Sequence, residues 1–289
     1  MNAPPFNFLG LEPPHCDYKS ARFAVLPIPY DSTTSYQTGT RGGPEAIIAA
    51  SRQVELFDEE TGGEAYKAGV ATLPAIEPNM AGPAAMHEDI FKTAKRVVRD
   101  GKFLFGLGGD HSVSSGLVRA VMGKHKKLSV LQIDAHTDLR DSYQGTPYSH
   151  ASVMRRIVDL GASIVQVGIR SVSPEEARYL RQTGRKPITA RDCHTDDNWV
   201  DRVMAGLSDT VYVTIDIDGF DPAYTPGTGT PEPGGLDWYQ VTGLLQLVAA
   251  EKNVVGADIV EVIPIPGQAV TEFLAARLAY KLMEYVVAK

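Results

Sequence analysis

Short runs of β-branched and other apolar residues alternate along the chain with longer stretches in which apolar residues recur every three or four positions. The short runs are typical of strands buried on both faces, and the longer stretches are typical of amphipathic helices. Alternation of this kind predicts repeated βα units around a parallel sheet. We predict strands at residues 22–28, 102–107, 128–133, 163–169, 210–215 and 254–260.

Helices are predicted between these strands and are clearest at residues 44–57, 84–99, 174–181 and 237–250. The first has a proline in its opening turn, where the missing N–H of proline costs nothing. We expect residues 1–20 to form an irregular arm. The chain has no low-complexity tract or Ser/Gly linker, and 289 residues suit one large α/β unit, so we expect residues 1–289 to fold as a single domain.

Composition narrows the class of protein. With 43% hydrophobic and 22% charged residues, the chain is typical of a globular protein. The net charge of -7 comes without a basic block, so we expect no nucleic-acid partner. No signal peptide and no apolar run of about 20 residues is evident, so we expect no membrane partner. Cys16 and Cys193 form no recognisable pair, which favours a reducing compartment, the cytoplasm by default.

Polar residues follow five of the predicted strands at their carboxyl ends. These segments read GGDHS, DAHTD, GIRS and DIDGFDP, and the last strand ends at Glu261. In a parallel α/β sheet, ligands bind outside the carboxyl ends of the strands. The sequence therefore predicts that these separate segments converge on one site.

Six groups in these segments suggest a metal centre, namely His111, Asp134, His136, Asp138, Asp216 and Asp218. Four crowded carboxylates would repel one another and raise their pKa values unless cations neutralised them. Two divalent ions would balance four negative charges. Carboxylate and imidazole ligands without thiolates suit an ion such as manganese and argue against a structural zinc site.

Each of these residues has a simpler explanation when taken alone. An aspartate at a strand end commonly caps a helix or forms a turn, and a single histidine is commonly a structural hydrogen-bonding residue. The joint pattern favours the metal centre.

The glycines of GLGGDHS have neither GxGxxG nor P-loop spacing, so we expect them to permit a sharp turn at His111. Residues 226–235 are either a plain surface loop or a rim over the site.

The motifs closely resemble those of the ureohydrolase family, which contains arginase and agmatinase. The resemblance runs from PYDSTTSYQTGTRGGPEAI through GGDHS, DAHTD, IDIDGFDPA and PGTGTPEPGG to ADIVEV, and so covers most of the chain. It implies an arginase-like three-layer α/β/α fold with a mainly parallel sheet. It also implies two Mn²⁺ ions per chain and a homotrimer or homohexamer.

The resemblance also assigns roles to residues. It implies one metal bound by His111 and Asp138, a second bound by His136 and Asp218, and bridging ligands Asp134 and Asp216. His150 matches the family's proton-shuttling histidine. The alternative for His150 is a surface histidine at the start of a helix. Glu261 matches the acid that faces the substrate guanidinium, and Asp138 would pass a proton to the leaving amine.

The implied reaction is hydrolysis of a small cationic guanidino compound to urea and an amine. Agmatine, giving putrescine for polyamine biosynthesis, is the first choice, and guanidinobutyrate, aminopropylagmatine and arginine are alternatives. A single-metal deacetylase-like hydrolase would have an adjacent His-His pair, which is missing, and a non-catalytic relative would have lost ligands. We expect Arg140 to point away from the crevice, because a guanidinium there would repel a cationic substrate.

Overall fold

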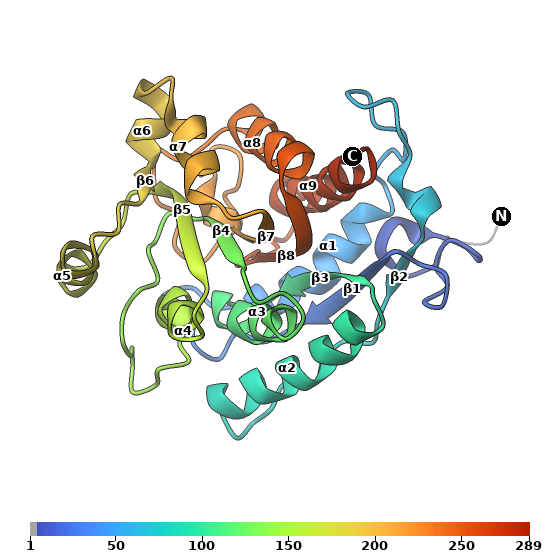
Figure 1. Ribbon diagram of the computed structural model, residues 1–289. Coiled ribbons are helices and arrows are strands. Elements are labelled where there is room, and N and C mark those ends of the chain that lie inside the picture. The colour runs from blue at the N-terminus through green and yellow to red at the C-terminus, as the bar shows by residue number, and fades with distance from the viewer. Residues whose placement is uncertain (1–4) are drawn as a thin grey trace.

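A parallel sheet with helices on both faces forms the centre of the protein (Figure 1). The computed structural model describes residues 5–289, and within them eight strands pair in the order β2-β1-β3-β8-β7-β4-β5-β6. The strands are β1 Phe23–Ile28, β2 Val70–Thr72, β3 Phe103–Gly108, β4 Ser129–Ile133, β5 Ser163–Ile169, β6 Ile188–Thr189, β7 Thr210–Asp216 and β8 Asn253–Val260. Every pair of neighbouring strands is parallel.

The six predicted strands are confirmed, each to within one residue at either end. The edge strands β2 and β6 were not predicted, because three and two residues are too few to show a pattern. The sheet is wholly parallel, and the predicted three-layer α/β/α class is confirmed.

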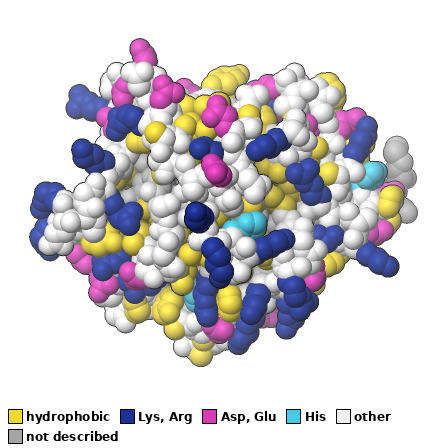
Figure 2. All heavy atoms as spheres, viewed as in Figure 1, with side chains coloured by type: hydrophobic (Ala, Val, Ile, Leu, Met, Phe, Trp, Pro, Cys, Tyr) yellow, Lys and Arg dark blue, Asp and Glu magenta, His cyan; other side chains and the backbone are white. Residues whose placement is uncertain are grey.

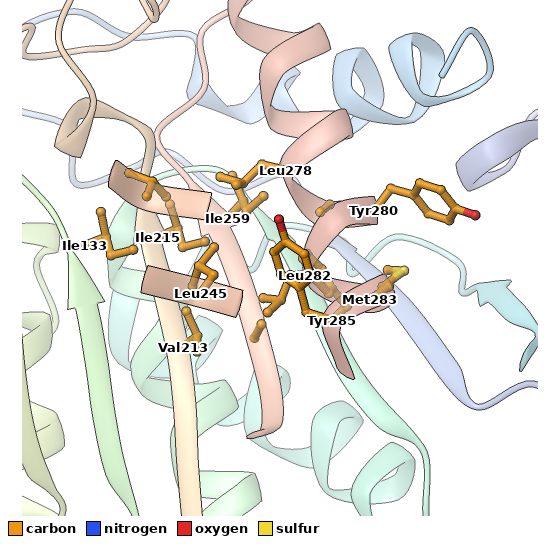
Figure 3. Packing of buried hydrophobic residues seen from close by; sticks show 14 of the residues in the cluster. Ile133, Val213, Ile215, Leu245, Ile259, Leu278, Tyr280, Leu282, Met283 and Tyr285 are labelled. Atoms are coloured by element: carbon orange, nitrogen blue, oxygen red, sulfur yellow. The ribbon is translucent and has the colours of Figure 1, made fainter. Parts of the chain in front are cut away.

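Helices cover both faces of the sheet (Figure 1). One face carries α1 Gly43–Ser51, α8 Trp238–Glu251 and α9 Val270–Val287, and the other carries α2 Pro83–Arg99, α3 Ser114–Met122 and α4 Val153–Asp159. The remaining helices follow β5 and β6 and are α5 Pro174–Thr183, α6 Ala190–Thr195 and α7 Trp199–Gly206. Each face has its own apolar core, and Figure 3 shows α9 packing its side chains beside those of β7 and β8.

Three predicted helices match α2, α5 and α8 to within two residues, but the helix predicted at residues 44–57 ends at Ser51. The amides of Gln53 and Val54 donate to carbonyls three residues back, a turn that ends the helix. The chain then reaches Asp58, whose Oδ2 lies 2.8 Å from the buried ammonium of Lys281 on α9. Helix α9 itself was not predicted. Twelve of its 18 residues are buried, including Lys281, so its sequence lacks the single apolar stripe of an amphipathic helix.

The predicted irregular arm packs against the body of the protein. Residues 1–4 lie outside the described part of the chain, and residues 5–20 contain only the short 3₁₀ turn Phe8–Gly10. The side chains of Phe8 and Leu9 are buried, and the amide of Leu9 donates to Ser51 Oγ at 2.8 Å. The arm is therefore fixed to the end of α1.

The surface carries both signs of charge. Basic and acidic side chains lie among one another on the face shown in Figure 2, with basic ones most frequent along its lower edge. Cys193 is buried and Cys16 is partly buried, and both are free thiols. Within residues 5–289, the structure has no helix whose length and hydropathy would let it cross a membrane.

Candidate metal centre and active site

The predicted ligands all lie at the carboxyl ends of three strands near the middle of the sheet. His111 follows β3, the DAHTD segment follows β4, and Asp216 and Asp218 end and follow β7. Strand β8, which ends just before Glu261, lies between β3 and β7 in the sheet. Because the strands are parallel, their carboxyl ends share one edge, and the predicted convergence is confirmed.

His111 is surrounded by carboxylates. Its Nδ1 atom lies 3.1 Å from Asp134 Oδ2, 3.1 Å from Asp138 Oδ2 and 3.4 Å from Asp216 Oδ2. All four side chains are buried. Among the described residues, no hydrogen bond with acceptable geometry satisfies Nδ1. A buried nitrogen aimed at three carboxylate oxygens is the arrangement that a shared cation would stabilise.

His136 forms a second group beside the first. Its Nδ1 atom lies 3.0 Å from Asp218 Oδ2 and 3.5 Å from Asp134 Oδ1. The donor atoms of Asp134, His136 and Asp218 lie within 4.8 Å of one another, as do those of His111, Asp134 and Asp216. Asp134 belongs to both groups, so the geometry fits two neighbouring cations that share this carboxylate.

Crowding of like charges shifts the ionisation of this cluster. Burial and repulsion from Asp134 raise the pKa of Asp138 to about 7. Burial and repulsion from Asp218 raise the pKa of Asp216 well above its ordinary value. Burial lowers the pKa of His136, but attraction to Asp218 and Asp134 outweighs it and raises the value to about 12. The cluster draws positive charge to itself, which is the electrostatic signature of a cation site.

Two functional candidates have strained main chains. Asp138 has φ 52° and Glu261 has φ 64°, in the left-handed region that residues other than glycine seldom adopt. The surrounding structure enforces both conformations. The carbonyl of Asp138 accepts hydrogen bonds from the amides of Met154 and Arg155, and the amide of Glu261 donates to Gly109. Such strain commonly marks functional positions.

A buried layer beneath the ligands fixes the orientation of His111. Its Nε2 atom lies 2.9 Å from Thr214 Oγ1, which donates to Asp258 Oδ1 at 2.6 Å. Tyr212 donates to the other oxygen of Asp258 at 2.7 Å. This layer was not predicted from sequence. A signal for it was present, since Asp258 is an acidic residue inside an otherwise apolar strand.

The glycines before His111 were predicted to permit a sharp turn at this residue. None of Gly106, Gly108 and Gly109 has a positive φ, so the turn needs no left-handed conformation at these positions. A Cβ atom on Gly109 would instead lie 2.0 Å from the carbonyl oxygen of Tyr30. The glycine allows two main-chain segments to approach closely, and this contact brings the loop after β1 to the site.

A cavity of about 360 Å³ opens over the cluster. Its lining includes the metal-ligand candidates Asp138, Asp216 and Asp218 and also Glu261. The loop at residues 226–235 contributes Gly229 and Thr230, which favours the rim over the plain surface loop, the two alternatives that the sequence left open. Aromatic and apolar side chains of Tyr36, Tyr143 and Val172 contribute to the walls.

Arg140 also lies in the lining of this cavity. Its guanidinium carbon lies 4.8 Å from the centre of the Tyr143 ring, a cation–π arrangement with another lining residue. That the guanidinium points away from the substrate stays a prediction.

His150 and Glu261 both face the cavity. His150 is the first residue of a 3₁₀ turn before α4. It therefore begins a helical segment, as one alternative held, and also lines the site, as the other held. Burial lowers the pKa of His150. Glu261 Oε1 accepts a hydrogen bond of 2.7 Å from the amide of His111, and burial together with repulsion from Asp110 raises the pKa of Glu261.

Comparison with known proteins agrees with this geometry. The sequence profile described as the arginase family matches residues 21–284. The chain belongs to the arginase family. The N(1)-aminopropylagmatine ureohydrolase of Synechocystis sp. is 40% identical over 93% of this chain and 90% of its own. The agmatinase of Pyrococcus horikoshii is 36% identical over 89% of each chain.

Similarity to arginase-family structures extends over the whole fold. The solved structure of proclavaminate amidino hydrolase from Streptomyces clavuligerus is 29% identical to this chain, with a TM-score of 0.90 over 100% of this chain and 98% of the other. The predicted arginase-like fold is therefore confirmed.

Proposed function

We propose that this arginase-family protein is a ureohydrolase that hydrolyses agmatine, or its close analogue N1-aminopropylagmatine, to urea and a polyamine. The observation that carries the proposal is the pair of His/Asp donor groups beneath a cavity that also exposes Glu261. Relatives named agmatinase and N(1)-aminopropylagmatine ureohydrolase support these two substrates. The corresponding role is polyamine biosynthesis, which we assign to the cytoplasm.

The cofactor in this proposal is a pair of Mn²⁺ ions. His111 and Asp138 would hold one ion, His136 and Asp218 the other, and Asp134 and Asp216 would bridge them. The unsatisfied Nδ1 atom of His111 and the oxygen-rich donor set fit such ions. When bound, divalent cations neutralise the carboxylates and make water acidic enough to serve as a nucleophile near neutral pH.

Glu261 orients the substrate in this mechanism. Its carboxylate would accept charge-assisted hydrogen bonds from the guanidinium and hold the central carbon over the ligand cluster. The His111 amide fixes one of its oxygens, Oε1. With the ligand carboxylates neutralised by the ions, the carboxylate of Glu261 would be the group in the lining that favours a cationic guanidinium over a neutral amide.

Protons move through Asp138 and His150. Asp138 lines the cavity as well as belonging to the ligand cluster, so its carboxylate is placed to take and return a proton at the reacting nitrogen. Asp138 would carry a proton to the leaving nitrogen of the tetrahedral intermediate. His150, in the cavity wall, would exchange protons with solvent and restore the starting state.

Arg140 favours a second candidate substrate. Its guanidinium in the cavity wall would attract a carboxylate at the far end of a guanidino acid, such as 4-guanidinobutyrate. The same charge would repel the far ammonium of agmatine. This substrate class would retain the proposed chemistry at the guanidinium and change only what meets the far end.

We further propose a homotrimer or homohexamer. An apolar surface groove lined by Tyr224, Trp238, Phe273 and Leu274 supports association, because large exposed apolar patches commonly mark protein interfaces. Sedimentation equilibrium gives the mass directly, and a stable monomer would contradict this part of the proposal.

The substrate is tested by urea release from the Mn²⁺-loaded protein. Agmatine, N1-aminopropylagmatine, 4-guanidinobutyrate and arginine are compared by kcat/KM, with Glu261→Gln as the matched variant that keeps the size of the side chain. We expect one of the two cationic polyamine precursors to be best, and Glu261→Gln to be strongly impaired. A higher kcat/KM for 4-guanidinobutyrate or arginine would overturn the substrate assignment, and no urea from any of them would overturn the function.

A further inference from the structure

The main chain around His150 is attached to a distant part of the sequence. The amide of His150 donates to Thr33 Oγ1 at 3.0 Å, across 117 positions of sequence. Its ring has weaker contacts, with Thr33 Oγ1 and Ser149 Oγ lying 3.5 Å and 3.3 Å from Nδ1. Ser35 Oγ lies 3.4 Å from Nε2. The amide contact is therefore the shortest of these four.

Thr33 is in turn fixed by a buried carboxylate. Asp110 Oδ2 accepts hydrogen bonds from the amide of Thr33 at 2.9 Å and from its hydroxyl at 2.8 Å. The other oxygen of Asp110 accepts from the amide of Ser112 at 3.1 Å and from its hydroxyl. Asp110 is fully buried and Thr33 is 6% exposed. Both oxygens of the carboxylate are thus occupied within the protein.

These contacts join three segments at one hydroxyl. Thr33 lies in the loop after β1, Asp110 lies in the turn that carries His111, and His150 begins the turn before α4. The Thr33 hydroxyl gives its only proton to Asp110, so it can meet the His150 amide only as an acceptor. Because Asp110 accepts the hydroxyl proton, a lone pair of Thr33 Oγ1 is left to accept the hydrogen bond from the His150 amide.

We propose that Thr33, oriented by Asp110, is the positioning residue for His150. Its hydroxyl holds the His150 main chain against the turn that bears His111 and so keeps the imidazole in the cavity wall. The inference rests on the proposed function, in which His150 restores the proton of the reaction. Thr33 itself touches no reacting atom in this role.

The test replaces Thr33 by Val, which keeps the shape and removes the hydroxyl, and by Ser, which keeps the hydroxyl. Thr242→Val is the matched control, because within residues 5–289 this buried hydroxyl donates to the carbonyl of Trp238 in the same helix, α8, and to no other group. Urea release with agmatine is measured in the wild-type and His150→Ala backgrounds, together with metal content. For Thr33→Val we expect a fall in kcat of about 10- to 100-fold with KM nearly unchanged.

Three further results are expected. Thr33→Ser restores kcat to within a few-fold, Thr33→Val keeps its full metal content, and the same substitution causes no additional loss in the His150→Ala background. Unchanged kcat in Thr33→Val, lowered metal content, or additive losses in the double variant would each overturn the proposal. If Thr33→Val does not fold, Thr33→Ala is compared with Thr33→Ser in the same way.

Hydrogen exchange separates this inference from the proposed function. In Thr33→Val, loss of the acceptor should speed exchange of the His150 amide by about tenfold, whether or not agmatine is a substrate. An unchanged exchange rate of the His150 amide would overturn the positioning role of Thr33. If the wild-type protein releases no urea but the His150 amide exchanges faster in Thr33→Val, the proposed ureohydrolase function would be overturned. The positioning role of Thr33 would still stand.

Discussion

His87 should make the protein sensitive to mild acid. This histidine lies on α2, is 8% exposed, and has Nδ1 2.9 Å from Ser115 Oγ on α3. Burial lowers its pKa from 6.5 to about 4. Nearby Arg119 acts in the same direction, so the folded protein keeps His87 neutral where an unfolded chain would protonate it.

The sign and size of the effect follow from proton linkage. Between pH 6.5 and pH 4 the unfolded chain binds a proton at His87 that the folded chain does not, so stability falls as pH falls. At pH 7 the cost is near zero. At pH 5 it is about 2 kcal/mol, because one pKa unit corresponds to about 1.4 kcal/mol and most of the shift is then expressed.

Urea denaturation at pH 7 and pH 5 measures this cost. The wild-type protein is compared with His87→Gln, which cannot titrate but keeps a polar group near Ser115, with Mn²⁺ saturating throughout. Other titrating groups contribute equally to both proteins and cancel. We expect the loss of stability between the two pH values to be about 2 kcal/mol smaller in the variant.

The less buried His125, in the loop after α3, provides the control. Burial lowers its pKa as well, but we expect a smaller change from His125→Gln. An identical loss of stability in wild type and His87→Gln would refute the reasoning, because it would mean that His87 is protonated in the folded state.

Three other predictions concern the site and its support. Chelation of metal should abolish urea release and lower the melting temperature, and Mn²⁺ should restore both; elemental analysis showing one metal or fewer per active chain would reject the dinuclear site. Asp216→Ala should lose more activity and metal than His150→Ala, whose loss we expect near 10²- to 10⁴-fold and partly rescued by imidazole. Lys281→Met should lower the free energy of unfolding, by at most about 3–5 kcal/mol, because buried Asp58 would lose its nearer cation and keep only the guanidinium of Arg277 at 3.7 Å; equal chemical denaturation curves would contradict this.

The sequence revealed the strands better than the helices. A strand buried on both faces reads as a continuous apolar run, so the six strands with at least five residues could be located. Helix α9 could not, because charges such as Lys281 and Glu284 inside it mark buried partners rather than a solvent-facing side. The segment after α1 leads to Asp58, whose partner Lys281 lies 223 positions further along the chain, a contact that no local pattern reveals.

The site was predictable where chemistry concentrates in short motifs. Asp134, His136 and Asp138 stand within five residues, and strand parallelism brings them to the other ligands. Thr33 gave no comparable signal, and the acidic Asp258 in an apolar strand did not reveal its partners, because both roles depend on contacts with residues far along the chain. The contact between Arg140 and the Tyr143 ring was not predicted either, because nothing in the motif pairs the two side chains.

The strand order has a consequence for how the protein acquires its metal during synthesis. Strand β8 enters the sheet between β3 and β7, although it is the last strand along the chain. A nascent chain that has already exposed all six proposed ligands therefore still lacks the central strand that brings β3 beside β7 and β4. An ion that binds at that stage would find His111 after β3 still separated from the ligands after β4 and β7. Selective metal loading must wait until the C-terminal residues have left the ribosome and closed the gap, so truncation there should erase the metal site without removing a single ligand.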